Sequence, residues 1–211
     1  MRQARVEMVR DMWESQAAII LAGGQSRRMG RNKALLPLPD NAQITFVEHM
    51  ATLLHRYCSN VVLVARDKQQ AGMYDTVPYV RLITDQILGV GPLMGLYSGL
   101  SALSSSHALA TAVDMPFLQP AMIEFLLTQW RHDNDELLVP VVNDIPQVLC
   151  AIYATTLLPT IELRLNEGRR DPRSLLTMAH VRYIEEAQLR AIEPELRSFV
   201  NINTPDEMAR Y

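Results

Sequence analysis

Short, largely apolar runs that alternate with helix-like segments restrict the fold of this chain more than any other feature. Four such runs lie at 17–22, 60–65, 79–84 and 107–113. An apolar run without polar alternation is typical of a strand buried on both faces, as in parallel sheets that are covered by helices. We therefore predict an α/β protein with a three-layer α/β/α, Rossmann-like fold and a mostly parallel sheet.

Signals between and after these runs support the same fold class. Capping residues and prolines predict helix starts at the Thr45–Glu48 capping box, near Pro92, at Pro120, at about Leu158, at Asp171 with Pro172, and at the Thr204–Glu207 capping box. The segments at 136–142 and 147–153 are predicted to be further strands. Ligands of such sheets bind outside the carboxyl ends of the strands. This rule directs attention to GGQSRRMGRNK, RDKQ, DQILGVGP and DMPF.

The composition excludes several classes of function. We expect a single domain over 17–211, preceded by an N-terminal extension over 1–16. The net charge of −3 argues against nucleic-acid binding through a broad basic surface. Cys58 and Cys150 form no CxxC pair, which disfavours a structural zinc site and fits a reducing cytoplasm. No apolar run approaches the roughly 18 residues that a membrane span needs.

The segment LAGGQSRRMGRNK at 21–33 has the composition of a phosphate-binding loop. Adjacent glycines at 23 and 24 allow backbone N–H groups to approach a phosphate, and the nearby Arg27, Arg28 and Lys33 can neutralise its charge. Neither the P-loop pattern nor the GxGxxG pattern of dinucleotide-binding proteins fits the spacing. From these residues alone, a glycine turn followed by a solvated basic loop remains an equal alternative.

A longer pattern distinguishes these alternatives. LAGGQSRRMGRNKALL closely resembles the signature LAGGxSxRMGxxKxLL of the nucleotidyltransferases in the molybdenum cofactor guanylyltransferase (MobA-like) family. The resemblance continues at DQILGVGPLMGLYSGL, VDMPFLQPAMIEFL, PQVLCAIY and FVNINTPDEMA, and so covers the chain from about 17 to 208. It implies a nucleotidyltransferase that transfers GMP from GTP to the terminal phosphate of Mo-molybdopterin and releases pyrophosphate.

The resemblance also implies roles for residues of the nucleotide half of the site. Lys33 and Arg28 would bind the triphosphate as catalytic residues. The backbone of Leu21, Ala22 and Gly23 would contact guanine, and Gly24 and Asp85 would be further nucleotide-binding positions. Asp114 would be both catalytic and the ligand of Mg²⁺, the expected cofactor, because this ion prefers carboxylate and phosphate oxygens. For Asp85 a turn residue without a ligand is an equal alternative.

The residues that bind the acceptor substrate, which form the acceptor half of the site, are expected in the second part of the chain. Asn201 and Asn203 of NINTP match a motif that the family uses there. Arg169 and Arg170 are candidate anchors for the acceptor phosphate, although a solvated helix end explains them equally well. GTP and Mo-molybdopterin are the expected partners, with transient contacts to other molybdenum cofactor proteins and none to nucleic acid or membrane.

Two other functions compete with this interpretation. One is a molybdopterin cytidylyltransferase or another nucleotidyltransferase of the same fold, and the other is a nucleotide-binding regulator without catalysis. Gly23 favours guanine, because cytidylyl relatives tend to carry LAAG at this point of the motif. Lys33 together with Asp114 argues against the regulator. Some relatives carry an asparagine after the second strand that touches the nucleotide, whereas this chain reads VLVAR at 62–66, so one base contact is absent.

Overall fold

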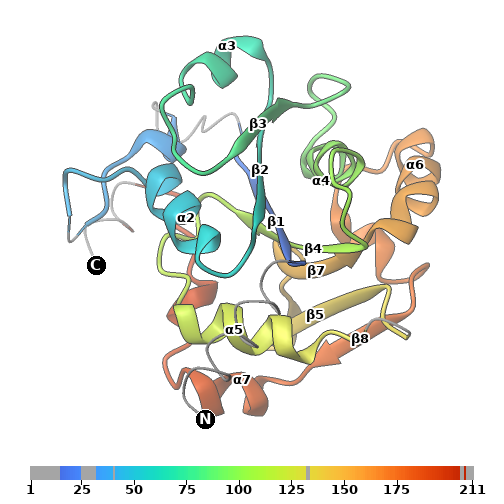
Figure 1. Cartoon of the computed structure of the whole chain (residues 1–211). Helices are drawn as coiled ribbons and strands as arrows, with labels where there is room; N and C mark the ends of the chain where they lie inside the picture. The colour runs from blue at the N-terminus through green and yellow to red at the C-terminus, as the bar shows by residue number, and fades with distance from the viewer. Residues whose placement is uncertain (1–14, 25–31, 40, 132–133, 205–206, 208–211) are drawn as a thin grey trace.

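A mixed sheet forms the centre of the molecule. The computed structural model describes residues 15–24, 32–39, 41–131, 134–204 and 207 (Figure 1). The strands, in their order across the sheet, are β3 (Arg81–Thr84), β2 (Asn60–Ala65), β1 (Ala17–Leu21), β4 (His107–Ala112), β7 (Cys150–Ala154), β5 (Leu137–Val142) and β6 (Ile145–Pro146), and β8 (Val181–Ile184) pairs with β5. Of the extension expected at 1–16, only 15 and 16 lie among the described residues.

The sheet is mostly parallel, as the sequence predicts. β1 pairs in parallel with both β2 and β4, and β2 pairs in parallel with β3. β7 runs antiparallel to both β4 and β5, so β5 and β8 again run in the direction of β4. The carboxyl ends of β1, β2, β3 and β4 therefore meet at one edge of the sheet.

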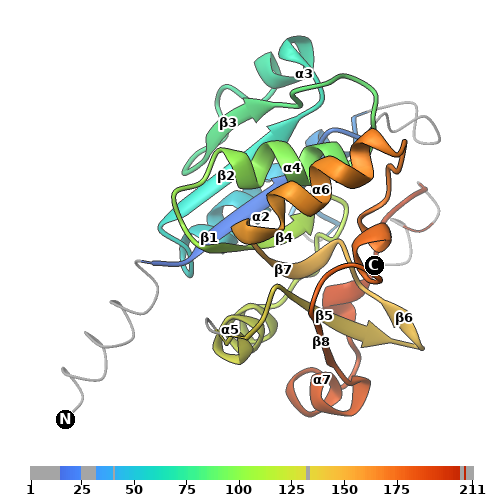
Figure 2. The same ribbon diagram turned by 90° about the vertical axis from the view of Figure 1, so that its right-hand side faces the viewer.

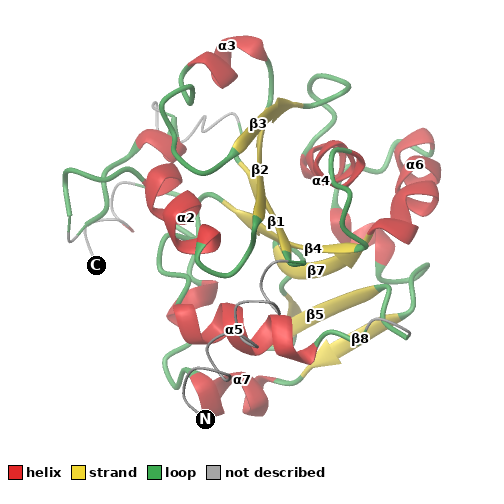
Figure 3. Ribbon diagram, viewed as in Figure 1, coloured by secondary structure: helices red, strands yellow, loops and turns green. Residues whose placement is uncertain are grey.

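Helices cover both faces of the sheet, which confirms the three-layer prediction (Figures 2 and 3). One face carries α2 (Phe46–His55), α5 (Pro120–Gln129) and α7 (Glu186–Ile192), and the other carries α4 (Pro92–Ser101) and α6 (Leu158–Asn166). The short helix α3 (Lys68–Gly72) lies beside β2 and β3. Short 3-10 helices complete the described elements: η1 (Lys33–Leu35), η2 (Thr155–Leu157), η3 (Pro172–Leu175) and η4 (Arg197–Phe199).

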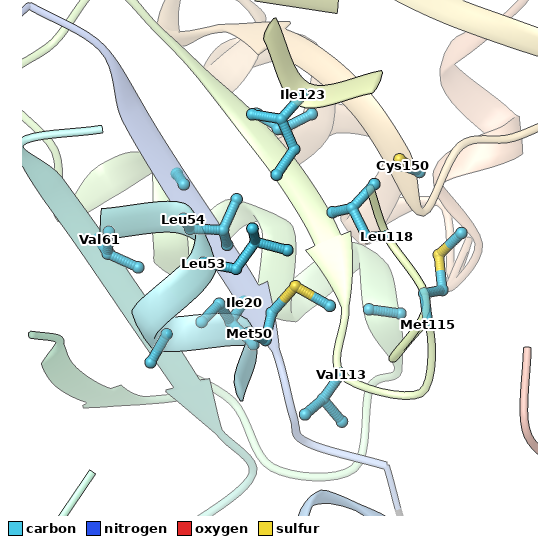
Figure 4. Packing of buried hydrophobic residues seen from close by; sticks show 14 of the residues in the cluster. Ile20, Met50, Leu53, Leu54, Val61, Val113, Met115, Leu118, Ile123 and Cys150 are labelled. Carbon is cyan, nitrogen blue, oxygen red and sulfur yellow. The ribbon is translucent and has the colours of Figure 1, made fainter. Parts of the chain in front are cut away.

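Strand β1 divides the apolar core into two parts. Ala18 and Ile20 point toward the α2 and α5 side, whereas Ala17 and Ile19 point toward α4. Figure 4 shows Ile20 packed with Met50 and neighbouring side chains of α2. Because side chains alternate between the two faces along a strand, a run that is apolar at every position supplies buried side chains to both parts of the core.

Most helix starts follow the capping signals. Thr45 and Glu48 form the predicted capping box, with the Glu48 carboxylate accepting hydrogen bonds from Thr45 N at 2.8 Å and Thr45 Oγ1 at 2.6 Å. α4 and α5 begin at Pro92 and Pro120. Asp171 does act as an N-cap, but the segment that it starts is the 3-10 helix η3 and not a longer helix.

Other boundaries differ from the prediction. β3 begins at Arg81 and not at 79, because Tyr79 adopts a φ of 63°, which a strand cannot contain. β7 begins at Cys150, because the residues before it form a turn in which Cys150 N donates to Gln147 O at 3.0 Å. The sequence analysis did not predict α3, α7, β6 or β8. Thr204 Oγ1 accepts from Glu207 N at 3.2 Å, as expected for a capping residue, but most of the helix predicted there lies outside the described residues.

The contact between Gly99 of α4 and Ile19 of β1 yields a stability prediction. A Cβ at position 99 would lie 2.7 Å from Ile19 Cγ2, and Ile19 is fully buried. Overpacking a core costs about 1–3 kcal/mol, whereas alanine contributes roughly 1 kcal/mol to a helix, which leaves a net cost of about 0–2 kcal/mol. We expect Gly99→Ala to lower the free energy of unfolding by about 1 kcal/mol, measured by urea denaturation.

Gly72→Ala is the matched control, because a Cβ at this position in α3 would meet no atom within 4 Å. This variant should be as stable as the wild type or slightly more stable. A Gly99→Ala protein with undiminished stability would show that α4 does not pack on β1 as closely as described.

Candidate active site

A pocket of about 510 Å³ opens at the carboxyl edge of the sheet, between the ends of β1 and β4 and the start of α4. This is the place that the sheet rule predicts, because the strand order reverses at β1. The pocket is lined by Leu21, Ala22, Gly23 and Gly24 from the segment after β1. It is also lined by Lys33, Asp85, Asp114 and Asn203, which come from four distant parts of the sequence.

The structure thus brings together most of the residues that the sequence selects, with four exceptions. Asn201, Arg169 and Arg170 are exposed and do not line this pocket. Arg170 nevertheless lies against its rim, because Leu93 N at the start of α4 donates to Arg170 O at 3.0 Å. Arg28 lies outside the described residues.

Lys33 and Asp114 form an ion pair at one end of the pocket. Lys33 Nζ lies 3.1 Å from Asp114 Oδ2, and the two side chains are only 15% and 24% exposed. Lys33 Nζ also donates to Asn203 Oδ1 at 2.8 Å. The ammonium group, the carboxylate and the amide therefore form one cluster, although Asn203 was assigned to the acceptor half and Lys33 to the nucleotide half.

Asn32 explains how Lys33 reaches this position. Its side-chain oxygen accepts from Ala34 N at 3.2 Å and so caps η1, in which Lys33 is the first residue. Its side-chain nitrogen donates to Tyr74 Oη at 2.9 Å, and Tyr74 is buried. The start of η1 is thereby fixed to the segment that follows α3.

Asp85 lies at the other end of the pocket, where its side chain is half-buried. Its Oδ1 is buried and has no hydrogen-bond partner among the described residues. Burial raises the pKa of this carboxyl group to about 7, although the positive charge of Arg66 opposes the shift. A Cβ on Gly95 would lie 3.4 Å from Asp85 Oδ1, so the small residue in α4 keeps the space beside this oxygen open.

Gln70 was not selected from the sequence, yet it ties together two walls of the pocket. This buried side chain of α3 donates from Nε2 to Ala22 O at 3.0 Å and accepts from Arg66 N at 2.7 Å. The loops after β1 and β2 are therefore held at a fixed separation. The only available signal was the segment RDKQ at 66–69, which follows a strand and directly precedes Gln70, since a single glutamine belongs to no motif.

The wall formed by β2 is apolar where some relatives carry asparagine. Val64 and Arg66 both line the pocket, and Val64 is buried. The Arg66 guanidinium pairs with Asp67, with 2.7 Å between Nε and Oδ2.

In this pocket, Asp114 is the candidate ligand for a divalent metal. Among the residues described, no three His, Cys, Asp or Glu side chains group into a metal site. Asp114 is a single, partly exposed carboxylate. Mg²⁺ often binds through one or two carboxylates and completes its shell with water and phosphate oxygens. Asp114 therefore suits a metal that arrives with a phosphorylated ligand.

Comparisons with known proteins agree with the fold. The chain belongs to the MobA-like NTP transferase domain family, whose model matches residues 18–186. It is 32% identical over 192 residues to the molybdenum cofactor guanylyltransferase of Desulfosudis oleivorans, covering 91% of this chain and 92% of that protein. It is 32% identical over 201 residues to a probable molybdenum cofactor guanylyltransferase of Methanothermobacter thermautotrophicus, covering 93% of this chain and 99% of that protein.

A solved structure extends the comparison to three dimensions. The molybdopterin-guanine dinucleotide biosynthesis protein A from Archaeoglobus fulgidus superposes with a TM-score of 0.81 and 29% sequence identity, covering 92% of this chain and 96% of that one. The chain is therefore an enzyme of the nucleotidyltransferase class, and such enzymes of this family generally need a divalent metal. In the described part of the chain, no helix combines the length and the apolar character needed to cross a membrane.

The raised pKa of Asp85 predicts how stability depends on pH. An unfolded chain has an Asp pKa of about 4, whereas the folded protein holds this proton up to about pH 7. The folded state therefore binds more protons over this interval, and the stabilisation from protonated Asp85 is lost as the pH rises through about 7. We expect Asp85→Asn, relative to the wild type, to gain more thermal stability at pH 8 than at pH 5. Equal differences in Tm at the two pH values would contradict the burial of this carboxyl group.

Proposed function

We propose that this protein is a molybdenum cofactor guanylyltransferase that transfers GMP from GTP to the terminal phosphate of Mo-molybdopterin and releases pyrophosphate. The relatives that are 32% identical over more than 90% of this chain carry that name, in one case as probable. The observation that carries the proposal is the Lys33–Asp114 pair beside the glycine segment, at the carboxyl edge of the sheet. A cytoplasmic location is part of the proposal and is supported by two buried free cysteines.

The base is proposed to bind at the Asp85 end of the pocket. Guanine offers two adjacent donors, N1–H and the 2-amino group, whereas the carboxylate of Asp85 can only accept. Asp85 Oδ1 is a buried acceptor without a partner among the described residues, which supports a donor-rich ligand edge at this place. Leu21, Ala22, Gly23 and Gly24 form the adjoining backbone wall.

The triphosphate is proposed to lie at the other end, near Lys33, and Arg28 is proposed as a further residue that binds it. A lysine ammonium acts as a point charge on phosphate oxygens and can stabilise the charge that grows on departing pyrophosphate. Asp114 would hold Mg²⁺, and the ion would neutralise negative charge on the phosphates. In this arrangement Lys33 exchanges at least part of its ion pair with Asp114 for contact with the nucleotide.

The reaction then needs positioning more than proton transfer. An oxygen of the acceptor phosphate attacks the α-phosphorus of GTP, and the bond from the α-phosphorus to the β-phosphate bridging oxygen breaks. The acceptor oxygen is already anionic, so the pocket needs no strong general base. It must align two anions and stabilise the leaving group. Asn201, Arg169 and Arg170 are proposed to address the acceptor, and Arg170 lies at the rim of the pocket.

Stabilisation by nucleotides tests the proposal. In the presence of Mg²⁺, GTP should raise the Tm of the protein more than CTP, ATP or UTP at equal concentration. Binding to the folded state alone adds about 2.7 kcal/mol at a hundredfold excess over Kd. A larger shift with CTP would contradict the guanine assignment and favour a cytidylyltransferase.

Asp114→Asn tests the metal assignment in the same assay. A neutral amide is a poor ligand for Mg²⁺, so this variant should lose the part of the GTP-dependent shift that needs Mg²⁺ and should lose turnover. The variant must retain a cooperative unfolding transition without ligand. A folded variant with a normal Mg²⁺ requirement would contradict the assignment, and GTP binding by the wild type without any turnover would favour the regulator.

A further inference from the structure

The contact between Asn203 and Lys33 joins the C-terminal segment to the nucleotide loop. The two residues are separated by 170 positions, yet Asn203 Oδ1 lies 2.8 Å from Lys33 Nζ. Both side chains line the same pocket. A hydrogen bond to a charged group is worth more than one between neutral groups, so this contact can influence where the ammonium group points.

The backbone around Asn203 is held on both sides. Asn203 N donates to Glu207 Oε2 at 2.5 Å. The preceding Ile202 is fully buried, and its backbone N donates to Asp114 O at 2.9 Å. The segment is therefore anchored to the loop that carries Asp114, so the backbone of Asn203 is held in place without the contact to Lys33.

Asp114 and Asn203, the two oxygen partners of the Lys33 ammonium group among the described residues, respond differently to a metal ion. A divalent cation on Asp114 engages the same carboxylate that now pairs with Lys33, and two positive charges at one carboxylate repel each other. The amide oxygen of Asn203 is neutral and belongs to a different loop. It remains available as an acceptor when the carboxylate is engaged.

We propose that Asn203 is a positioning residue for nucleotide binding: its side-chain oxygen keeps the Lys33 ammonium directed into the pocket when a divalent metal occupies Asp114. This inference rests on the proposed function and deepens it. It also differs from the division drawn from the sequence, which places Asn203 with the acceptor and predicts unchanged GTP affinity in Asn203→Ala. The contact with Lys33 predicts weaker binding.

A double-mutant cycle with Lys33 separates a positioning role from a merely structural one. The Kd of GTP is measured by calorimetry, with Mg²⁺ present, for the wild type, Lys33→Ala, Asn203→Ala and the double variant. We expect Asn203→Ala to weaken binding about tenfold, the scale of one hydrogen bond. If Asn203 acts through Lys33, its substitution in the Lys33→Ala background changes Kd less than twofold.

The metal dependence supplies a second readout. With EDTA in place of Mg²⁺, Asp114 still holds Lys33, so Asn203→Ala should weaken GTP binding much less than it does with Mg²⁺. Asn166→Ala is the matched control, because this asparagine ends α6 on an exposed surface away from the pocket. Its Kd should equal that of the wild type under both conditions.

The outcomes keep the two proposals apart. The positioning role is overturned if Asn203→Ala leaves the affinity for GTP unchanged, or lowers it equally in the wild-type and Lys33→Ala backgrounds. In either case, GTP binding by the wild type leaves the proposed function standing. A loss of equal size with Mg²⁺ and with EDTA also overturns it. Failure of the wild type to bind GTP with Mg²⁺ overturns the proposed function, and the positioning role with it.

Discussion

The parallel pairing of β1 with both β2 and β4 is the constraint on which the rest of the structure depends. Leu21 lies opposite Val64 on one side and Ala112 on the other, so the chain leaves all three strands at the same level. The glycine segment, Arg66 and Asp114 meet at the pocket for that reason. If β1 shifted by one residue against its neighbours, Ile19 would point into the core that now holds Ile20, and Ile20 into the core that now holds Ile19. Both cores would then lose their packing.

The two ends of the pocket differ in physical character. At one end the half-buried Asp85 has a buried Oδ1 without a partner among the described residues, and this oxygen offers an acceptor to a base that donates hydrogen bonds. At the other end the Lys33–Asp114 pair, together with Asn203, supplies charge for phosphate and a ligand for a metal. The buried Gln70 fixes the separation of the loops between which the base is proposed to bind.

The layers, the parallel strands and most helix starts could be predicted because they follow from local patterns. An apolar run such as 17–22 must be buried on both faces, and Thr45 with Glu48 caps a helix whatever lies around it. β3 starts late because Tyr79 has a positive φ, which no propensity indicates. β8 and α7 were missed because Val181–Ile184 is short and half-exposed, and α7 is short.

The candidate site could likewise be predicted only where a local sequence pattern identifies its residues. The motif selected Gly23, Lys33 and Asp114 in advance, and the structure places them around one pocket. The contacts of Gln70 with Ala22 and of Asn203 with Lys33 join segments that are 48 and 170 residues apart. Such contacts depend on how loops from different strands meet, and neither residue carries a local signal of its partner.

Transfer of isotope from GTP tests the central claim most directly. The wild-type protein is incubated with Mg²⁺, Mo-molybdopterin and GTP that is labelled either at the α-phosphorus or at the γ-phosphorus, and the products are separated. The proposed reaction places the α-label in the cofactor and the γ-label in pyrophosphate. An unlabelled cofactor after incubation with α-labelled GTP, or γ-label in the cofactor, would contradict it.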